Sequence, residues 1–300
     1  MSNRLGLAFA LTMVLANVSS GAAPSSAASQ VLPASAFSYD AGAPLAVKVA
    51  RTWNEGSLTF KDLTFASAGR RVHAEVVVPK VSSPHPGVLF VHWLGDPKTT
   101  NLTEFVPDAR SLAASGITSV LIDAMWAQPS WFDKRRSTDT DYVASIAQIV
   151  DLRRALDLLE AQPNVDPSAI GYVGHDFGAM YGAILSAIDP RPRCYVLMAG
   201  VPTLSEWYLL GAPPKDKVRY VGQMSVLDPI KYLTRSSAQS FLFQFALKDE
   251  YVPLSEAERF ASSAPGERAA FFYASDHKLG QPEIAADRLA WLTARLRSLP

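Results

Sequence analysis

Residues 169–182, AIGYVGHDFGAMYG, constrain the fold of this chain more than any other stretch. The first half is an apolar run suited to a buried parallel strand, and residues 179–188 have the composition of a helix packed on that strand. Gly174 and Gly178 flank the central Asp176. Glycine is expected at both positions because a side chain there would collide with the neighbouring strand and helix. The pattern predicts a sharp strand-to-helix turn that holds Asp176 at a helix N-terminus, where backbone N–H groups face negative charge.

The segments around this turn predict an α/β protein with a mostly parallel, doubly wound sheet. Residues 57–65 and 71–79 alternate apolar and polar, which indicates an antiparallel hairpin at the sheet edge. The other strands are predicted at 88–93, 117–123, 194–199, 240–246 and 269–273, and the helices at 103–115, 141–160 and 281–296. With 300 residues the chain is long enough for one such domain, predicted over 51–300.

The turn resembles the nucleophile elbow of the α/β-hydrolase superfamily, with Asp176 in the place of the esterase serine. The sequence Gly-His-Asp-Phe-Gly is similar to the elbows of haloalkane dehalogenases and epoxide hydrolases. The flanking segments look more like the dienelactone hydrolase and acyl-peptidase-related branch, and the resemblance covers about residues 57–297. It implies an α/β-hydrolase fold with a short cap insertion at about 201–233. The alternative is a glycine-rich turn in another doubly wound protein.

Two further residues complete the site that the resemblance implies. Asp249 follows the strand at 240–246, where the superfamily places the carboxylate that orients a histidine, and Glu250 is the alternative. His277 follows the last strand, at the place of the general base. The order Asp176, Asp249, His277 is the chain order of this fold. Three polar loop residues placed by chance are the other interpretation.

The resemblance also implies an oxyanion hole and a pocket wall. One N–H comes from Phe177 and the other from Leu94 or its immediate neighbour. His92 and His175 are interpreted as structural. Aromatic residues at strand ends and in the cap predict an apolar pocket. The pocket candidates are Trp93, Trp126, Trp207, Tyr208, Tyr220 and Tyr251.

An aspartate nucleophile favours displacement at saturated carbon, in an alkyl halide or a strained epoxide, because its attack on an ester would give an anhydride. The resemblance implies an alkyl ester on Asp176, which water activated by His277 then hydrolyses. Halide release needs donors such as the indole N–H of Trp93, Trp126, Trp131 or Trp207, and epoxide opening needs an acid such as Tyr208, Tyr220 or Tyr251. Phe177 stands where the dehalogenases often carry tryptophan, and it has no donor.

A second class of function stays open. The segments around the elbow also fit a relative of the esterases and dienelactone hydrolases with a degenerate nucleophile, acting as a non-catalytic binding protein. The complete pair of Asp249 and His277 argues for the enzyme.

The composition narrows the choice of partners. Lys+Arg and Asp+Glu both number 28, so the formal net charge is zero, which argues against nucleic acid or an anionic membrane as partner. The sequence carries no metal-ligand cluster, phosphate loop or dinucleotide fingerprint, so neither metal nor cofactor is expected. The predicted partner is a small-molecule substrate, and the oligomeric state stays open.

The N-terminus has the pattern of a secretory signal peptide, predicted over residues 1–23. Arg4 precedes an apolar run at 5–18, which is short for a membrane span, and small residues follow it. Residues 24–50 are predicted to be a flexible lead-in. A secreted or periplasmic protein without stable membrane association after cleavage is expected, and an uncleaved N-terminal anchor is the alternative.

Overall fold

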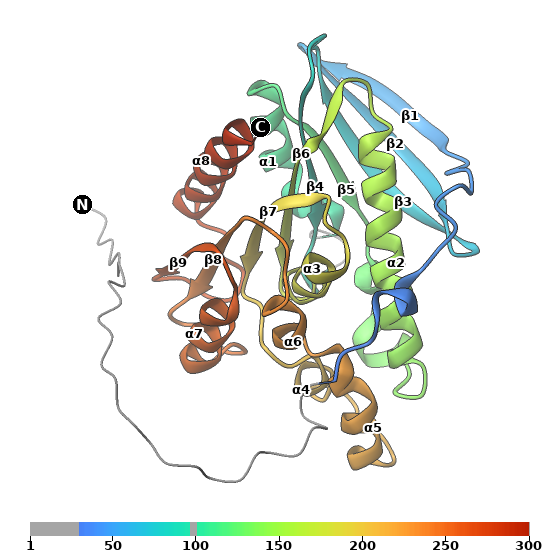
Figure 1. Cartoon of the computed structure of the whole chain (residues 1–300), viewed down its shortest axis with the longest axis vertical. Helices are drawn as coiled ribbons and strands as arrows, with labels where there is room; N and C mark the ends of the chain where they lie inside the picture. Colours follow the sequence, from blue (N-terminus) through green and yellow to red (C-terminus); the bar gives the residue numbers. More distant parts are fainter. Residues whose placement is uncertain (1–29, 97–100, 300) are drawn as a thin grey trace.

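A nine-stranded sheet forms the centre of the protein in the computed structural model, which describes residues 30–96 and 101–299 (Figure 1). The strand order is β1-β2-β3-β5-β4-β6-β7-β8-β9. β1, β2 and β3 are antiparallel to their neighbours, and the pairs from β5 across to β9 are parallel. The strands are β1 (Lys48–Glu55), β2 (Leu58–Ser67), β3 (Arg70–Pro79), β4 (His85–Val91), β5 (Thr118–Ile122), β6 (Val165–His175), β7 (Pro192–Met198), β8 (Ser240–Ala246) and β9 (Glu267–Tyr273).

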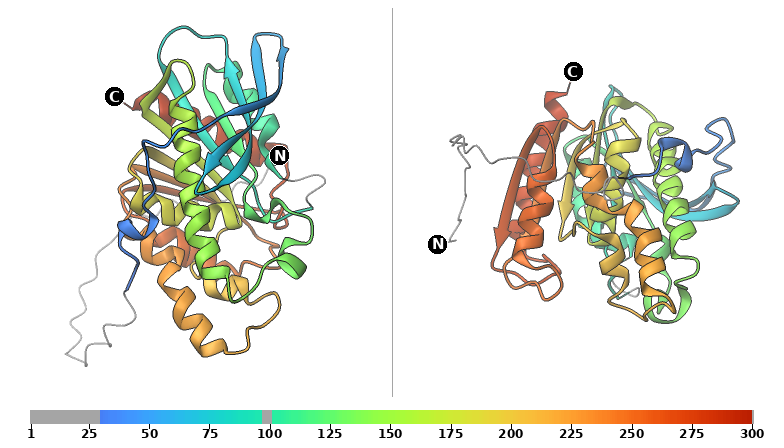
Figure 2. Two further views of the ribbon diagram at one scale, coloured as in Figure 1. Left: turned by 90° about the vertical axis from the view of Figure 1, so that its right-hand side faces the viewer. Right: turned by 60° about the horizontal axis from the view of Figure 1, so that its bottom comes forward.

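Helices cover both faces of the sheet. α1 and α8 pack together on one face, while α2 and α3 pack together on the other (Figures 1 and 2). The longer helices are α1 (Val106–Ala114), α2 (Asp141–Glu160), α3 (Phe177–Ile188), α7 (Leu254–Ser263) and α8 (Pro282–Ser298). Short helical turns are η2 (Ala34–Phe37), η3 (Leu102–Phe105), η4 (Met125–Ala127) and η5 (Trp131–Arg135).

The burial of each strand follows from its place in the sheet. Every residue of β5 and β8 is buried, because helices cover both faces of these strands, and their sequences are accordingly apolar runs. β1 is an edge strand whose residues are mostly exposed. Its sequence lacks a clean apolar alternation, so the sequence pattern does not predict this strand.

The order of the strands reverses at β4. The strand that follows β4 in the chain, β5, lies on one side of it, and the next one, β6, lies on the other side. Ligands of doubly wound sheets bind at such a point, outside the carboxyl ends of the strands. The segments that follow β4 and β6 therefore define where a site is expected.

Residues 201–233, predicted as a cap, connect β7 to β8 through four short helices. The cap leaves the sheet at the carboxyl end of β7, the edge at which β6 also ends, and it lies at the lower end of the molecule in Figure 1. α6 packs on α3, and α5 contacts α2. The helices are α4 (Leu204–Tyr208), α5 (Lys217–Met224), η6 (Ser225–Leu227) and α6 (Pro229–Leu233).

Residues 30–47, here called the N-terminal strap, pack on the domain. The Phe37 ring is buried and meets Tyr232 edge-on, with 6.1 Å between ring centroids. The Leu32 N–H donates to the Tyr232 hydroxyl over 3.1 Å, and the Tyr39 hydroxyl donates to Asp157 over 2.8 Å. These contacts and the start of β1 hold the described part of the predicted flexible lead-in against the domain. The predicted signal peptide lies outside the described residues.

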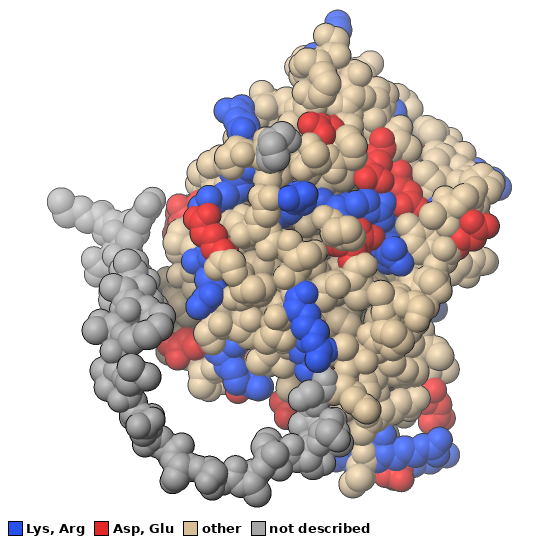
Figure 3. All heavy atoms as spheres, in the orientation of Figure 1, with Lys and Arg blue, Asp and Glu red and all other residues tan. Residues whose placement is uncertain are grey.

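The surface carries both signs of charge. Acidic and basic side chains are interspersed over the face shown in Figure 3, in agreement with a formal net charge of zero. Within residues 30–96 and 101–299, no helix has the length and apolar composition needed to cross a membrane.

Candidate active site

Asp176 lies between the end of β6 and the first residue of α3. Its backbone has φ 54° and ψ −114°, a sparsely populated conformation for a residue with a side chain. A Cβ on Gly174 would lie 2.3 Å from the carbonyl oxygen of Gly178, and a Cβ on Gly178 would lie 2.2 Å from that of Val91. Both glycines are therefore required for the sharp turn.

The carboxylate of Asp176 is buried and has two unequal oxygens. Oδ2 accepts a hydrogen bond from the Leu94 N–H over 3.0 Å. Oδ1 is buried and has no hydrogen-bond partner among the described residues. Burial raises the pKa of Asp176 from 3.8 to about 6, although the charge of His277 and the Leu94 hydrogen bond act in the opposite direction.

His277 and Asp249 form an ion pair beside this carboxylate. The His277 Nδ1 lies 2.9 Å from Oδ2 and 3.0 Å from Oδ1 of Asp249. Since a carboxylate only accepts, Nδ1 carries the proton, and Nε2 is the nitrogen that can act as a base. The N–H groups of Tyr251 and Val252 also donate to Asp249, over 2.9 and 3.0 Å, and fix its orientation.

The interaction between His277 and Asp249 raises the pKa of the histidine and lowers the pKa of the aspartate. Burial would lower the pKa of His277, but the hydrogen bond to Asp249 and the charge of Asp176 outweigh it, so the pKa is raised. Burial would raise the pKa of Asp249, but the hydrogen bond and charge of His277 lower it. The structure thus brings Asp176, Asp249 and His277 together at the ends of β6, β8 and β9.

The loop after β4, to which the resemblance assigns an oxyanion donor and which is here called the oxyanion loop (residues 92–95), is held by buried hydrogen bonds. The His92 Nδ1 donates to the Trp93 carbonyl over 2.7 Å, and Nε2 accepts from the Ala124 N–H over 3.1 Å. This arrangement requires a neutral ring, and burial lowers the pKa of His92. The indole N–H of Trp126 donates to the His92 carbonyl over 3.1 Å. His92 is therefore a structural residue.

The backbone N–H groups of this loop have separate roles. The Trp93 N–H donates to Glu104 Oε2 over 3.0 Å, while the Leu94 N–H faces Asp176. Leu94 is therefore the loop donor next to the carboxylate. Phe177 begins α3, so its N–H belongs to the first turn, where N–H groups have no partner within the helix.

Three of the predicted pocket residues pack against the His277 ring. Its ring centroid lies 5.7 Å from Trp93, 6.0 Å from Trp207 in the cap and 5.1 Å from Tyr251. Tyr251 is half exposed, and its pKa is raised by the charge of Glu250 and, more weakly, by those of Asp249 and Asp176. These three pocket candidates lie at the site.

Trp126 and Tyr208 lie on the other side of the elbow, against Phe177. Their rings are 5.2 and 5.3 Å from the Phe177 ring. The Tyr208 hydroxyl lies 2.8 Å from that of Tyr181 in a buried cluster, and the Trp126 N–H is bound to the oxyanion loop. Both residues shape the packing under Phe177, but their polar groups already have buried partners. Their predicted roles as halide donor and proton donor are corrected accordingly.

Tyr220 faces α2, and its predicted place in the pocket wall is also corrected. Its hydroxyl donates to Asp141 Oδ2 over 2.8 Å, in a buried cluster with Arg136. The buried carboxylate of Asp141 requires a donor at the N-terminus of α2, and Tyr220 supplies it. The aromatic content of the cap does not reveal which of its rings face the elbow.

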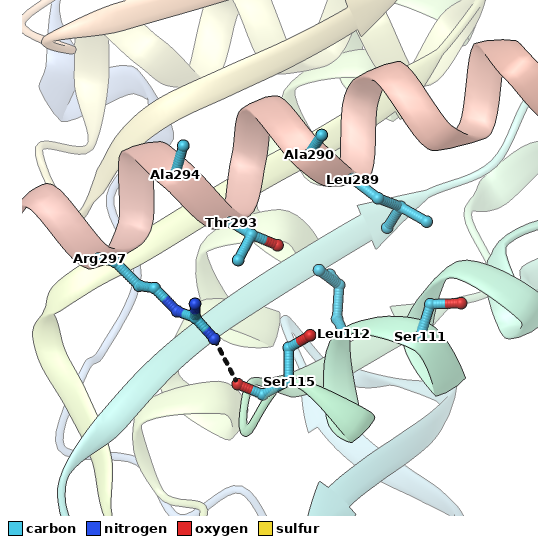
Figure 4. A pocket seen from close by; sticks show the side chains of 8 residues that line it. All are labelled: Ser111, Leu112, Ser115, Leu289, Ala290, Thr293, Ala294 and Arg297. Carbon is cyan, nitrogen blue, oxygen red and sulfur yellow. Dashed lines mark hydrogen bonds between the residues drawn. The ribbon is translucent and has the colours of Figure 1, made fainter.

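Two cavities show where ligands could enter. One of about 330 Å³ adjoins the oxyanion loop and is lined by Leu94, Gly95, Gln128, Ser130, Trp131, Phe132 and Asp133, a size suited to a small molecule. The other, of about 420 Å³, lies between α1 and α8 (Figure 4). Its lining includes Arg297, which donates to the Ser115 carbonyl over 3.4 Å, but none of the predicted site residues. The first cavity therefore adjoins the loop whose Leu94 N–H binds Asp176.

Glu104 belongs to this site and was not predicted from the sequence. Its two carboxylate oxygens contact Trp93 and His175, which are 11 and 71 residues away. A lone glutamate in a predicted helix carries no spacing signal, so only the fold reveals these contacts. In the part of the chain that the structure describes, no group of three or more His, Cys, Asp or Glu side chains could hold a metal ion.

The sheet order, the turn that carries Asp176 and the loops that carry Asp249 and His277 define the α/β-hydrolase fold. Solved structures with this fold match the chain over most of its length, which confirms the predicted fold class. By sequence, neither a family model nor a curated protein matches the chain.

Two of the similar solved structures are acetyl xylan esterases. The enzyme from Thermoanaerobacterium sp. has a TM-score of 0.71 at 16% identity, over 88% of this chain and 92% of that one. The enzyme from Paenibacillus sp. R4 has a TM-score of 0.70 at 18% identity, over 87% and 92%. The 2,6-dihydroxy-pseudo-oxynicotine hydrolase has a TM-score of 0.60 at 19% identity, over 78% and 67%. At these identities the likeness establishes the fold alone.

Proposed function

We propose that this protein is a hydrolase in which Asp176 is the nucleophile, His277 the general base and Asp249 the carboxylate that orients it. The observation that carries the proposal is the unequal environment of the two Asp176 oxygens. Oδ2 is held by the Leu94 N–H, and Oδ1 has no hydrogen-bond partner among the described residues. Oδ1 is therefore the attacking oxygen. Once it is alkylated, Oδ2 becomes an ester carbonyl oxygen that already lies on an oxyanion donor.

The substrate class follows from the nucleophile. Oδ1 attacks a saturated carbon, and the bond from that carbon to the halide or the epoxide oxygen breaks. An epoxide oxygen needs a proton, and Tyr251 is the tyrosine candidate whose ring lies against His277 and is half exposed. We therefore propose a small apolar epoxide or alkyl halide, with Tyr251 as the acid in the first case.

The electrostatics of the site support a two-step reaction. In the resting site the charge of Asp176 contributes to the raised pKa of His277. Alkylation removes that charge, so the pKa of His277 falls when the alkyl ester forms. The ring is then more readily neutral, and it can take a proton from the water that attacks the Asp176 carbonyl carbon. Release of the alcohol restores the carboxylate.

Ester hydrolysis is the second candidate. It is supported by the two acetyl xylan esterases among the similar structures. In this case Asp176 would not be alkylated, and His277 would activate water directly. A non-catalytic binding protein with a degenerate nucleophile is a third possibility, but it gives no reason for the ion pair of Asp249 and His277.

The test is intact-protein mass spectrometry of a His277→Gln variant with three probes: propylene oxide, ethyl bromide and p-nitrophenyl acetate. The proposal expects an adduct on Asp176 with one of the first two probes, because the variant can complete the first step but not the second. The double variant His277→Gln/Asp176→Asn is the control and should stay unmodified. Cleavage of p-nitrophenyl acetate by a single Asp176→Asn variant, which keeps His277, without any adduct would favour the second candidate.

We also propose that the protein is exported, on the basis of the sequence at residues 1–23 alone. In a bacterial host, the mature protein should be recovered from the periplasm or medium with the signal removed. Its mass gives the cleavage point. Full-length protein retained in the cytoplasm would contradict this proposal.

A further inference from the structure

We propose that Glu104 and His175 act as a positioning pair that couples the oxyanion loop to the loop carrying His277. The inference rests on the proposed function of the same site. Glu104 lies in η3 and His175 is the last residue of β6, directly before Asp176. His175 is fully buried with both its ring nitrogens bound, and both carboxylate oxygens of Glu104 are bound to Trp93 and His175, so the pair is assigned a positioning role rather than contact with substrate.

The pair forms one continuous chain of hydrogen bonds. Glu104 Oε2 accepts from the Trp93 N–H over 3.0 Å, and Oε1 lies 2.6 Å from His175 Nδ1. His175 Nε2 donates to the backbone carbonyl of His277 over 3.0 Å. The chain therefore begins at the residue before the Leu94 donor and ends at the backbone of the general base.

Proton counting shows why the two side chains act together. The His277 carbonyl only accepts, so His175 Nε2 must carry a proton. The short contact from Nδ1 to Glu104 requires a second proton, held between the ring and the carboxylate. The pair therefore shares one proton and is neutral as a whole, which costs less in a buried position than a single charge.

The packing around the pair shows what it positions. The Trp93 ring lies 5.4 Å from His175 in a stacked arrangement and 5.7 Å from His277. Glu104 occupies the Trp93 N–H, so the next N–H in the loop, that of Leu94, faces Asp176. Without Glu104, both the Leu94 donor and the His277 ring would lose a fixed support.

Two substitutions at Glu104 distinguish a role of its hydrogen bonds from a role of its negative charge. In Glu104→Gln, the amide oxygen can accept from Trp93 and the amide N–H can donate to a neutral His175, so the chain of contacts is kept. In Glu104→Ala, the chain is broken. A positioning role thus predicts that glutamine rescues function and alanine does not, whereas a role of the charge itself predicts that both fail. Glu256→Ala, at a partly exposed glutamate paired with Arg259 on α7, is the matched control.

The first readout is ¹⁵N NMR of the histidine rings in the protein without ligand. The His277 ring signals should shift in Glu104→Ala and stay close to the parent in Glu104→Gln and Glu256→Ala. In Glu104→Gln, His175 should change from a proton-sharing ring to a single neutral tautomer. Unchanged His277 signals in a folded Glu104→Ala would overturn the inference. If that variant does not fold, an unchanged His175 in Glu104→Gln would do so.

The second readout is the rate at which propylene oxide or ethyl bromide modifies Asp176 in the His277→Gln background. Glu104→Ala should slow this step by about 100-fold, the scale expected for a misplaced reacting group. Glu104→Gln should restore most of the rate. If no variant, including the parent, is modified, the proposed function fails while the NMR result still decides the positioning pair.

Discussion

Replacement of Asp176 by asparagine should stabilise the protein, although it should abolish alkylation. Asp176 is 2% exposed, and burial raises its pKa from 3.8 to about 6. That difference corresponds to about 3 kcal/mol of destabilisation when the carboxylate is charged. Asparagine has nearly the same shape, can still accept from Leu94, and tolerates positive φ. Its amide NH2 then takes the place of Oδ1, which has no partner among the described residues, and a buried donor without an acceptor costs about 1–3 kcal/mol. Asp176→Asn should therefore raise the free energy of unfolding at pH 8 by about 3 kcal/mol from the lost charge, less this pH-independent cost.

The pH dependence of this gain distinguishes it from ordinary packing effects. Below pH 3.8 both the folded and the unfolded states hold the proton, so the carboxylate costs nothing. As the pH rises towards about 6, the unfolded state releases its proton first, and the wild-type protein loses stability. The contribution of the lost charge should thus shrink to about half at pH 5, so the advantage of Asp176→Asn should fall by about 1.5 kcal/mol between pH 8 and pH 5. Urea unfolding at pH 8 and pH 5 measures both values.

The control for this prediction is Asp249→Asn, which should have the opposite sign. The pKa of Asp249 is lowered, so its charged form is stabilised in the folded protein and removal of the charge should destabilise it at pH 8. An Asp176→Asn variant that is less stable than the wild type at pH 8 would refute the reasoning. A gain of the same size at both pH values would refute it as well.

Three further predictions concern activity and the elbow. The kcat/KM value should rise with pH through about 6, because Asp176 must be ionised to attack; a kcat/KM profile with its maximum at pH 5 would contradict this. Gly178→Ala should cost at least about 3 kcal/mol in urea unfolding and most of the activity, because its Cβ would meet a β4 carbonyl. Gly222→Ala, where the added Cβ meets no atom within 4 Å, should raise the free energy of unfolding by up to about 1 kcal/mol. Equal losses of stability in the Gly178 and Gly222 variants would contradict the elbow geometry. Trp126→Phe should slow modification by propylene oxide and ethyl bromide equally, whereas a loss confined to the bromide would restore its role as halide donor.

The elbow could be predicted from the sequence because its requirements are local. The spacing of Gly174 and Gly178 around Asp176 reflects contacts within one turn and with the adjacent strand. Asp249 and His277 could be located because each follows a strand, and the carboxyl ends of parallel strands meet at one edge of a sheet. These positions depend on the order of the elements along the chain rather than on the details of packing.

Other features depend on contacts that no spacing rule encodes. Glu104 reaches partners on two separate strand ends, and nothing in its neighbourhood marks it. Tyr220 and Trp207 lie in the same aromatic insertion, yet one binds Asp141 and the other stacks on His277. The orientation of the cap helices decides between these positions. The edge strand β1 was not predicted, because a strand whose residues are mostly exposed has little hydrophobic pattern in its sequence.

The N-terminal strap gives the cap a mechanical link to the body of the enzyme fold. Leu32 and Phe37 contact Tyr232 on α6, and Tyr39 is bound to Asp157 on α2, so the strap connects the last helix of the cap to a helix that packs on the sheet. A protein trimmed to start at residue 48 would keep all of β1 and the three site residues but lose these contacts. Changes in the strap are therefore expected to act on the cap without altering Asp176, Asp249 or His277.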